Sequence, residues 1–214
     1  MNAVGPRHPA LEAGLVWLAV CAALAVLLHL GGRLPVGSVL VPVVWLWTPP
    51  AVLYFTRRNF AEYGLLPADW RRGLGLGAIA SAVILPLFAA GYWLTWGVFA
   101  GRALAWQFNG PAAKFAFTSL IVFALPEEVF FRGYLQTLFA KAWPSRRGQD
   151  LAIVAAAACF ALAHLLPGPQ LSRLATFFPG LVLGWLRRRS GGIVAPIVFH
   201  ALANATMVIL EGRL

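Results

Sequence analysis

Long apolar runs dominate this sequence of 214 residues, and they constrain its fold more than any other feature. Hydrophobic residues make up 60% of the chain and charged residues 11%, whereas soluble domains carry about 25% charged residues. So little polar surface cannot cover a soluble globule, so the solvent around most of the chain is a lipid bilayer. The sequence therefore predicts an all-α fold, a polytopic bundle of transmembrane helices.

Seven segments are long and apolar enough to be considered as spans, since a helix crosses the bilayer with about 20 residues. Several segments are short, so the expectation is about seven spans within a range of six to eight. The expected spans are residues 11–30, 36–55, 74–99, 114–140, 151–166, 171–186 and 193–210. We expect one integral membrane domain, 1–214, in which 1–73 holds two helices and an interfacial loop and 74–214 forms the core.

Basic residues are concentrated in alternate loops, which predicts the orientation of the chain. Most of the 17 Lys and Arg residues lie before the first span, in 56–72, in 141–150 and in 187–189. Such loops face the cytoplasm, so the N-terminus is expected there. The net charge of +10 comes from these clusters beside apolar runs, a pattern typical of membrane proteins rather than nucleic-acid-binding ones. The high Ala, Arg and Gly content favours a bacterial cell membrane.

Six polar side chains remain in the interior of the expected spans after the loops are set aside. A charge in hydrocarbon costs at least about 2.5–3.5 kcal/mol, so an ionisable residue there is a candidate functional residue. The six residues are Glu127, Glu128, Arg132, His164, His200 and Asn204.

Helical spacing separates the two acidic residues. Glu128 and Arg132 are four residues apart and share a helix face, so they can form an ion pair. Glu127 lies about 100° away around the helix and is left free to react. The alternative is that both acids and Arg132 form one buried polar clamp between helices.

The remaining side chains fit the hydrolysis of an amide. Glu127 can act as a general base on water if His164 orients the water and shares the proton. His200 and Asn204 are four residues apart on one face and could hold an oxyanion. No cofactor is needed for this chemistry. The alternative is a zinc site built from Glu127, His164 and His200, although the sequence lacks H-E-x-x-H.

Three motifs in order resemble those of the CPBP family, which comprises type II CAAX prenyl proteases and bacteriocin-processing or immunity proteins, also called ABI proteins. The motifs are Glu127-Glu128-x-x-x-Arg132, Phe160-x-x-x-His164 and His200-x-x-x-Asn204. Residues 178–200, between the second and third motifs, also resemble the family. The resemblance covers roughly residues 115–206, and earlier residues share only their hydrophobicity with it.

The resemblance implies a glutamate-type intramembrane endopeptidase with its catalytic core in 74–214. Glu127 and His164 would activate water, His200 and Asn204 would form the oxyanion hole, and Glu128, Arg132 and Phe160 would support the site. Its partners would be the lipid bilayer and a membrane-anchored protein or peptide, such as a C-terminal sorting tail or a bacteriocin precursor, with no nucleic acid. The alternatives are a non-catalytic immunity or scaffold protein, the zinc-dependent protease, and a transporter with a proton relay.

Overall fold

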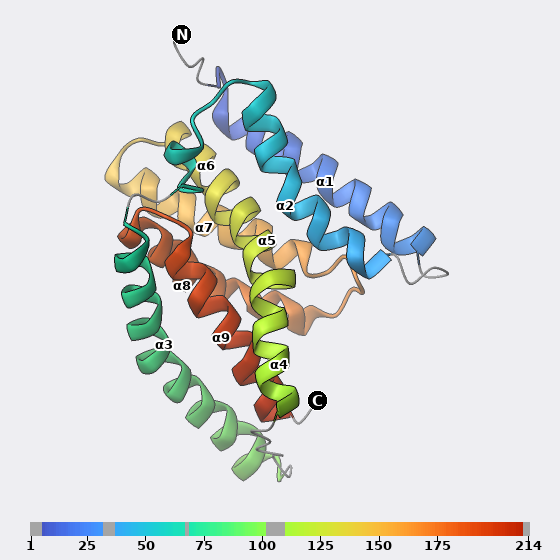
Figure 1. The fold of residues 1–214 in the computed structure, drawn as a ribbon. Coiled ribbons are helices and arrows are strands. Elements are labelled where there is room, and N and C mark those ends of the chain that lie inside the picture. Colours follow the sequence, from blue (N-terminus) through green and yellow to red (C-terminus); the bar gives the residue numbers. More distant parts are fainter. Residues whose placement is uncertain (1–5, 32–36, 67–68, 102–109, 212–214) are drawn as a thin grey trace.

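The computed structural model describes residues 6–31, 37–66, 69–101 and 110–211, and within them every regular element is a helix (Figure 1). The N-terminal half holds α1 (Pro9–Gly31), α2 (Gly37–Phe55), a short 3₁₀ turn (Phe60–Tyr63) and α3 (Trp70–Tyr92), which continues as a π-helix (Trp93–Phe99). One long helix then runs through α4 (Gly110–Ser119), α5 (Leu125–Glu128) and α6 (Gln136–Ala142). The C-terminal part holds α7 (Arg146–Ala163), a 3₁₀ turn (Leu171–Thr176), α8 (Phe177–Ser190) and α9 (Val194–Glu211).

The all-α bundle predicted from the apolar runs is confirmed for the described part of the chain. Within the described residues, three stretches are by themselves long and apolar enough to cross a membrane: Pro9–His29, Trp70–Phe99 and Val194–Glu211. A shorter apolar stretch, Leu40–Phe55, lies beside the first of them. Together these helices indicate an integral membrane protein, whereas the number of spans, the orientation and the bacterial cell membrane remain predictions.

Two expected helices begin earlier than their apolar segments do, because polar residues cap them. α3 starts at Trp70, within the expected loop, and the Asp69 side chain accepts a hydrogen bond from the Arg72 N–H. α7 starts at Arg146 instead of 151, with the Ser145 hydroxyl accepting from the Gly148 N–H. Such capping satisfies N–H groups that the first helical turn leaves unpaired.

The sixth expected span, 171–186, is shifted along the chain. Residues Leu171–Thr176 form a 3₁₀ turn, and α8 continues to Ser190 instead of stopping at the three arginines. Cations in a last turn interact favourably with the helix dipole, and Gly191, with φ of 74°, provides the left-handed residue that ends the helix. Of the expected loop 101–113, residues 102–109 lie outside the described part, and 110–113 are already helical.

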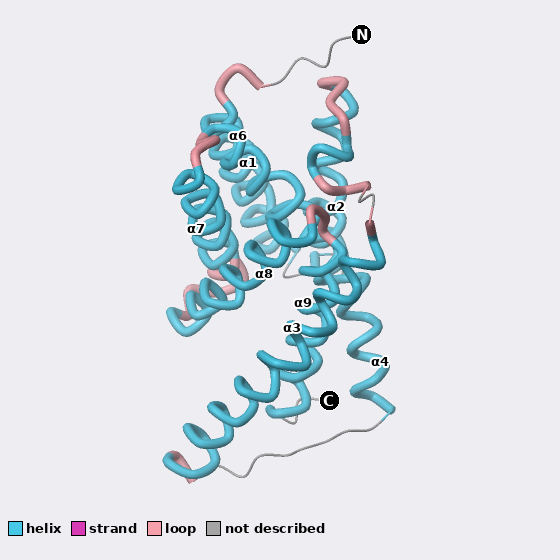
Figure 2. Tube along the Cα trace, turned by 90° about the vertical axis from the view of Figure 1, so that its left-hand side faces the viewer, coloured by secondary structure: helices cyan, strands magenta, loops and turns pink. Residues whose placement is uncertain are grey.

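α3 and α9 lie side by side in both overall views (Figures 1 and 2). Glycines on α3 face the start of α9. A Cβ at Gly73 would lie 2.9 Å from the Val194 Cβ, and one at Gly77 would lie 2.8 Å from the Ala195 oxygen. The two backbones can therefore approach as closely as small residues at a four-residue spacing allow in membrane helix pairs.

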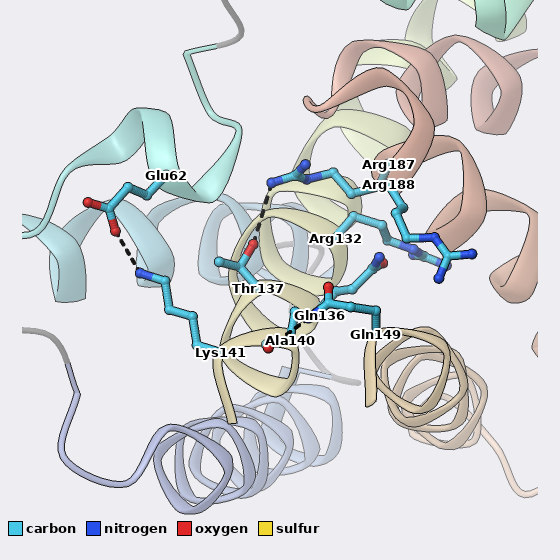
Figure 3. A pocket seen from close by; sticks show the side chains of 9 residues that line it. All are labelled: Glu62, Arg132, Gln136, Thr137, Ala140, Lys141, Gln149, Arg187 and Arg188. Atoms are coloured by element: carbon cyan, nitrogen blue, oxygen red, sulfur yellow. Dashed lines mark hydrogen bonds and ion pairs between the residues drawn. The ribbon is translucent and has the colours of Figure 1, made fainter. Parts of the chain in front are cut away.

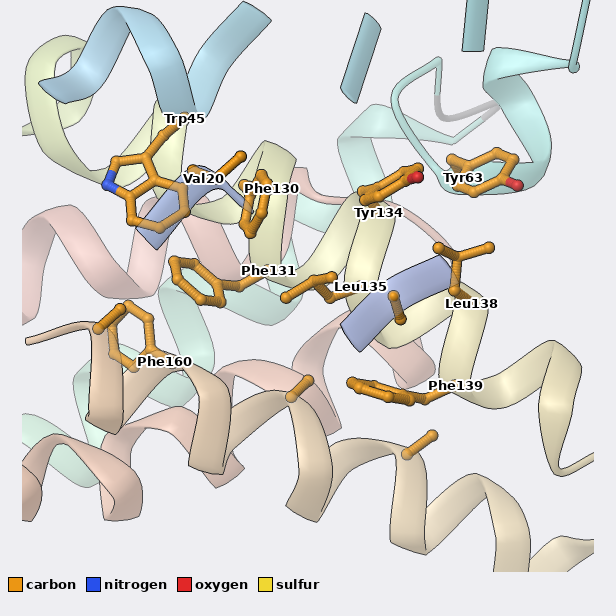
Figure 4. Packing of buried hydrophobic residues seen from close by; sticks show 14 of the residues in the cluster. Val20, Trp45, Tyr63, Phe130, Phe131, Tyr134, Leu135, Leu138, Phe139 and Phe160 are labelled. Atoms are coloured by element: carbon orange, nitrogen blue, oxygen red, sulfur yellow. The ribbon is translucent and has the colours of Figure 1, made fainter. Parts of the chain in front are cut away.

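A cluster of buried aromatic rings surrounds the middle of the long helix (Figure 4). Trp45 of α2 contacts Phe130 and Phe131, with ring centroids 4.5 and 5.0 Å apart. Phe131 in turn meets Phe160 of α7 edge to face, at 5.1 Å. Because aromatic pairs of this kind pack in defined geometries, they fix the segment that carries the acidic pair between α2 and α7.

An ionic group that the sequence reasoning did not single out ties α1 to the long helix. The Glu12 carboxylate accepts two hydrogen bonds from Arg58, at 2.6 and 2.9 Å, and one from the Tyr134 hydroxyl at 2.7 Å. The Glu12 carboxylate also raises the pKa of Arg58, which lies in the loop after α2. A bidentate pair of this kind is among the stronger polar contacts, so it anchors the N-terminal helices to the core.

Candidate active site

The acidic pair lies between two π-helical stretches of the long helix. Leu120–Ala124 and Val129–Leu135 are π-helical, and α5, which holds Glu127 and Glu128, lies between them. Pro126 lies at the start of α5 and has no N–H to donate to the preceding turn. π-Bulges occur often at functional sites, and these two rotate the side chains around the acidic pair relative to a regular α-helix.

Glu128 lies at the centre of a buried ionic cluster, defined here as Glu128, Arg132 and His200. One oxygen of its fully buried carboxylate accepts from Arg132 Nη1 at 3.0 Å, so the ion pair expected from the spacing is present. The same oxygen lies 2.8 Å from His200 Nδ1. An ionised carboxylate only accepts, so Nδ1 of His200 donates. Glu128 is thus held by two donors from two different helices.

Arg132 is itself fully buried, and Phe160 and Gly180 form its surroundings. The centre of its guanidinium lies 4.2 Å from the centroid of the Phe160 ring, a favourable cation–π arrangement. Arg132 Nη2 donates to the Gly180 carbonyl at 3.4 Å. A Cβ at Gly180 would lie 3.5 Å from that nitrogen and 3.1 Å from the Ala157 Cβ, so α8 approaches α7 closely here. Phe160 therefore supports the cluster directly.

Glu127 lines a cavity, and the residue of the buried ionic cluster beside it is His200. The Glu127 side chain is 19% exposed, and its Oε2 lies 3.7 Å from His200 Nε2. The cavity has a volume of about 230 Å³. Its lining, mostly apolar, consists of Leu24, Leu28, Val41, Trp45, Glu127, Phe131, Ala163, His164, Leu166, Pro167 and Arg173. Glu127 and His164, from different helices, therefore share one cavity.

The tautomer of His164 follows from its own hydrogen bond. Nδ1 lies 2.8 Å from the Phe160 carbonyl oxygen, which can only accept, so Nδ1 carries the proton. Nε2 of the neutral ring is then a lone-pair acceptor. The Phe160 ring meets the imidazole edge to face at 4.4 Å and restrains its orientation. A histidine held in this way, at the end of α7, can take a proton from a group in the cavity.

His200 and Asn204 do not bind one common acceptor, although both lie on α9. His200 is engaged with Glu128, as described above. Asn204 Nδ2 donates to the Ser119 hydroxyl of α4 at 3.0 Å. Neither residue is among those that line the cavity. The oxyanion-hole assignment of this pair remains a prediction.

Several residues around the site were missed by sequence reasoning. Ser119, fully buried, is a hydroxyl inside an apolar run eight residues before Glu127. Residues eight positions apart lie on the same face of a regular α-helix, so this spacing is a weak indication that Ser119 belongs to the site. Arg173 was counted as a loop residue, yet it lines the cavity, and its Nη1 donates to the His164 carbonyl at 3.4 Å. Leu24 and Trp45 come from 1–73, where the sequence showed only hydrophobicity.

Among the described residues, no three His, Cys, Asp or Glu side chains are grouped closely enough to hold a metal ion. Glu127, His164 and His200, the candidate zinc ligands, therefore do not form a compact ligand set in this arrangement. The expectation that no cofactor is needed remains a prediction.

Comparison with known proteins bears on the part of the chain that carries all three motifs. Residues 109–206 match a family model described as type II CAAX prenyl endopeptidase Rce1-like. No curated protein and no solved structure matches the chain. The family match confirms the resemblance drawn from the motifs, and it supports a CAAX-type intramembrane protease in general terms.

Proposed function

We propose that this chain, whose residues 109–206 match the CAAX protease-like family, is a glutamate-type protease that cleaves a peptide bond within or beside the membrane. The observation that carries the proposal is the shared cavity of Glu127 and His164. One side chain is a carboxylate without a short hydrogen bond among the described residues, and the other is an imidazole whose free nitrogen is an acceptor. Such a pair can bind and activate a water molecule.

The proposed reaction begins with a water molecule between Glu127 and His164. Glu127 removes a proton from this water while the water oxygen attacks the scissile carbonyl carbon. The product of this step is a tetrahedral intermediate with a negatively charged oxygen. The C–N bond then breaks, and the proton passes to the leaving amine through Glu127 or His164. General acid–base catalysis of this kind contributes about 10²- to 10⁴-fold to a rate.

The intermediate needs hydrogen-bond donors near its oxyanion. His200 Nε2 lies 3.7 Å from Glu127 Oε2 and would donate to the oxyanion when both ring nitrogens carry a proton, while Nδ1 stays bonded to Glu128. Asn204 would act as the second donor through the other hydrogen of its amide NH2 group, while the bond to Ser119 holds the side chain in place. Glu128 and Arg132 hold His200 in place and are positioning residues in this scheme.

The cavity walls favour an apolar substrate segment. α1 and α2 contribute Leu24, Leu28, Val41 and Trp45, while Arg173 is a cation among the lining residues. Residues on both sides of a scissile bond in a membrane anchor are largely apolar, which suits such walls. We therefore propose membrane-anchored proteins or peptides as substrates, with C-terminal sorting tails and bacteriocin precursors as the two classes to try first.

The test is a cleavage assay with the full chain reconstituted in liposomes together with membrane-anchored peptides of these classes. Glu127→Gln keeps the shape of the side chain but cannot accept the proton, so cleavage should be lost. The matched control is Asp150→Asn, which removes an exposed carboxylate remote from the cavity and should cleave as the wild type does. A folded Glu127→Gln protein that cleaves at the wild-type rate would exclude Glu127 as the general base and so overturn the mechanism.

A chelator distinguishes the proposed mechanism from the zinc-dependent alternative. The wild type is assayed before and after treatment with a strong chelator, and again after zinc is restored. A glutamate-type enzyme keeps its activity throughout. Loss with the chelator and recovery with zinc would instead show a zinc-dependent protease, with Glu127, His164 and His200 as its candidate ligands.

A further inference from the structure

A second cavity lies on the other side of the long helix, between α6 and the last turn of α8 (Figure 3). Its volume is about 360 Å³, which is within the range of ligand pockets. We call it the basic pocket, and the lining residues that matter here are Arg132, Gln136, Thr137, Lys141, Arg187 and Arg188. Four of these six side chains are cations, and the proposed hydrolysis uses none of them directly.

Three of the four cations already have an acidic partner. The pairs are Arg132–Glu128, Lys141–Glu62 and Arg188–Asp150. Arg187 differs, because no carboxylate of the described residues lies within 4.0 Å of it. Its side chain makes one long hydrogen bond, from Nη2 to the Thr137 hydroxyl at 3.5 Å, and its buried Nε has no partner. The basic pocket thus holds one cation without a counter-ion.

Arg187 is nevertheless held in place by the backbone around it. Its guanidinium lies against Gly64, where an added Cβ would be 2.5 Å from Nη2. Gly64 has φ of 68°, and its carbonyl accepts from the Ile193 N–H at 3.2 Å. The Arg187 side chain is half-buried, and a charge that is partly removed from water and left unpaired is unfavourable. The arrangement therefore suits an anion that binds in the pocket and completes the pairing.

The pocket also holds other polar groups without partners. Arg132 Nε is a buried donor without a partner that an anion could accept from, whereas the unpaired Gln136 Oε1 only accepts and would need a donor such as a hydroxyl. Arg132 is fully buried and lines the pocket from within. An arginine fork matches the oxygens of a phosphate, to which it can donate two parallel bonds.

Tryptophans around the basic pocket indicate its depth in the membrane. Trp143 at the end of α6 and Trp185 on α8 are both exposed, and the Arg189 guanidinium lies 5.7 Å from the centroid of the Trp185 ring. Exposed Trp beside basic residues is typical of the membrane–water interface, where lipid phosphates lie. The two basic segments expected in the cytoplasm, 141–150 and 187–189, meet at this end through the Arg188–Asp150 ion pair, and the cytoplasmic leaflet carries the anionic lipids.

From these observations we infer that the basic pocket binds the headgroup phosphate of an anionic lipid, with Arg187 as its main partner and Lys141 at the exposed rim. The position of the basic pocket at the membrane–water interface and the unpaired Arg187 favour a lipid phosphate over a soluble phosphate. The inference does not rest on the proposed hydrolysis, since a lipid would bind here whether or not the Glu127 cavity is catalytic.

The test measures lipid binding to the detergent-solubilised full chain by native mass spectrometry. The probes are phosphatidylglycerol, phosphatidylcholine and inorganic phosphate. Phosphatidylglycerol should bind more tightly than the other two. Arg187→Gln should weaken its binding by about fivefold, as expected for one basic residue near anionic lipid, and Arg187→Lys should restore part of it. The matched control is Arg189→Gln, which removes the same charge from the same helix turn but leaves the pocket unchanged.

Lys141→Gln keeps the inference testable if Arg187→Gln fails to fold, because Lys141 is exposed and its removal should also weaken phosphatidylglycerol binding. An equal loss in Arg189→Gln and in the pocket variants would mean general attraction to the basic surface and would overturn the site. If inorganic phosphate binds as tightly as phosphatidylglycerol, the phosphate in the pocket need not belong to a lipid, and that result would overturn the lipid assignment.

Discussion

Glu127 and Glu128 are neighbours in the chain, but they lie in two contrasting regions. The Glu128 side is a fully buried ionic cluster with Arg132 and His200, and the Glu127 side is a cavity with mostly apolar walls. Glu128 has two donors within 3.0 Å, whereas His200 Nε2, beside Glu127, lies 3.7 Å from its carboxylate. Two side chains of the same type therefore differ in which partners they can bind.

The difference teaches that availability, and not acidity alone, separates a structural carboxylate from a reactive one. Both donors of Glu128 bond its Oε1, and its unpaired Oε2 is fully buried and lines neither of the two cavities described above, so an attacking water has no access to this carboxylate. A carboxylate beside a cavity keeps its lone pairs for a substrate or a water. His200 lies between the two regions, since it bonds Glu128 and faces Glu127, and so it couples the position of one to the other.

The largest expected effect is on the cavity side. Glu127→Gln should lower kcat by about 10²- to 10⁴-fold, as should His164→Ala, because each removes a proton acceptor. If the two act as a unit, the double variant should be no slower than the worse single variant. Initial rates of peptide cleavage in liposomes measure this. Losses that multiply in the double variant would show that the two residues act independently.

The next effect should appear in stability on the buried side. Glu128→Gln leaves Arg132 without its charge partner inside the bundle, so the protein should lose about 3–5 kcal/mol of unfolding free energy. Glu127→Gln, the neighbouring control, should change stability little because Glu127 makes no short ion pair. Denaturant unfolding in mixed micelles compares the two variants. Equal destabilisation would remove the contrast between the two regions.

A smaller effect should follow from crowding the arginine. Gly180→Val would place a side chain against Ala157 and near Arg132 Nη2, and overpacking of this kind costs about 1–3 kcal/mol. Gly75→Val on α3 is the control, because a Cβ there meets nothing within 4 Å. The unfolding midpoint of each variant is measured in the same detergent. If Gly75→Val is as harmful as Gly180→Val, close packing around Arg132 is not the cause.

The smallest effect concerns the link between Asn204 and α4. Ser119→Ala removes a hydrogen bond worth about 0.5–1.5 kcal/mol, so kcat should fall about two- to tenfold if that bond orients Asn204. Asn204→Ala should cost more, since loss of an oxyanion donor is worth about 10²- to 10³-fold. Steady-state cleavage kinetics distinguish them. An active Asn204→Ala protein would remove Asn204 from the oxyanion hole.

Sequence reasoning reached the helical bundle and the Glu128–Arg132 pair because both depend on local rules. Apolar run length indicates a membrane helix, and a four-residue spacing brings two side chains together. It did not reach the Glu128–His200 bond, which joins residues 72 positions apart and depends on how α9 packs. It also misjudged the end of α8, because an arginine cluster was taken for a helix stop when it forms the last turn.

The residues of α1 and α2 that line the cavity could not be predicted from the sequence, for a different reason. Any apolar residue in 1–73 fits a membrane helix equally well, so nothing distinguishes Leu24 or Trp45 from residues that face lipid. Their place in the cavity follows from the packing of Trp45 on Phe130 and Phe131. The interior of a membrane bundle can be predicted from polar residues, whereas its apolar lining depends on tertiary contacts.

The two π-helical stretches around the acidic pair have a consequence for how the long helix tolerates changes in length. A π-turn contains one residue more than an α-turn, so each stretch advances the following side chains by about 100° around the axis. Deleting one residue from Leu120–Ala124 would allow a regular α-helix there. The deletion would also rotate Ser119 by about 100° around the helix axis relative to α5. The alignment between the two ends of this helix is therefore encoded by residue number as much as by residue identity, and single-residue deletions there should be far less tolerated than conservative substitutions.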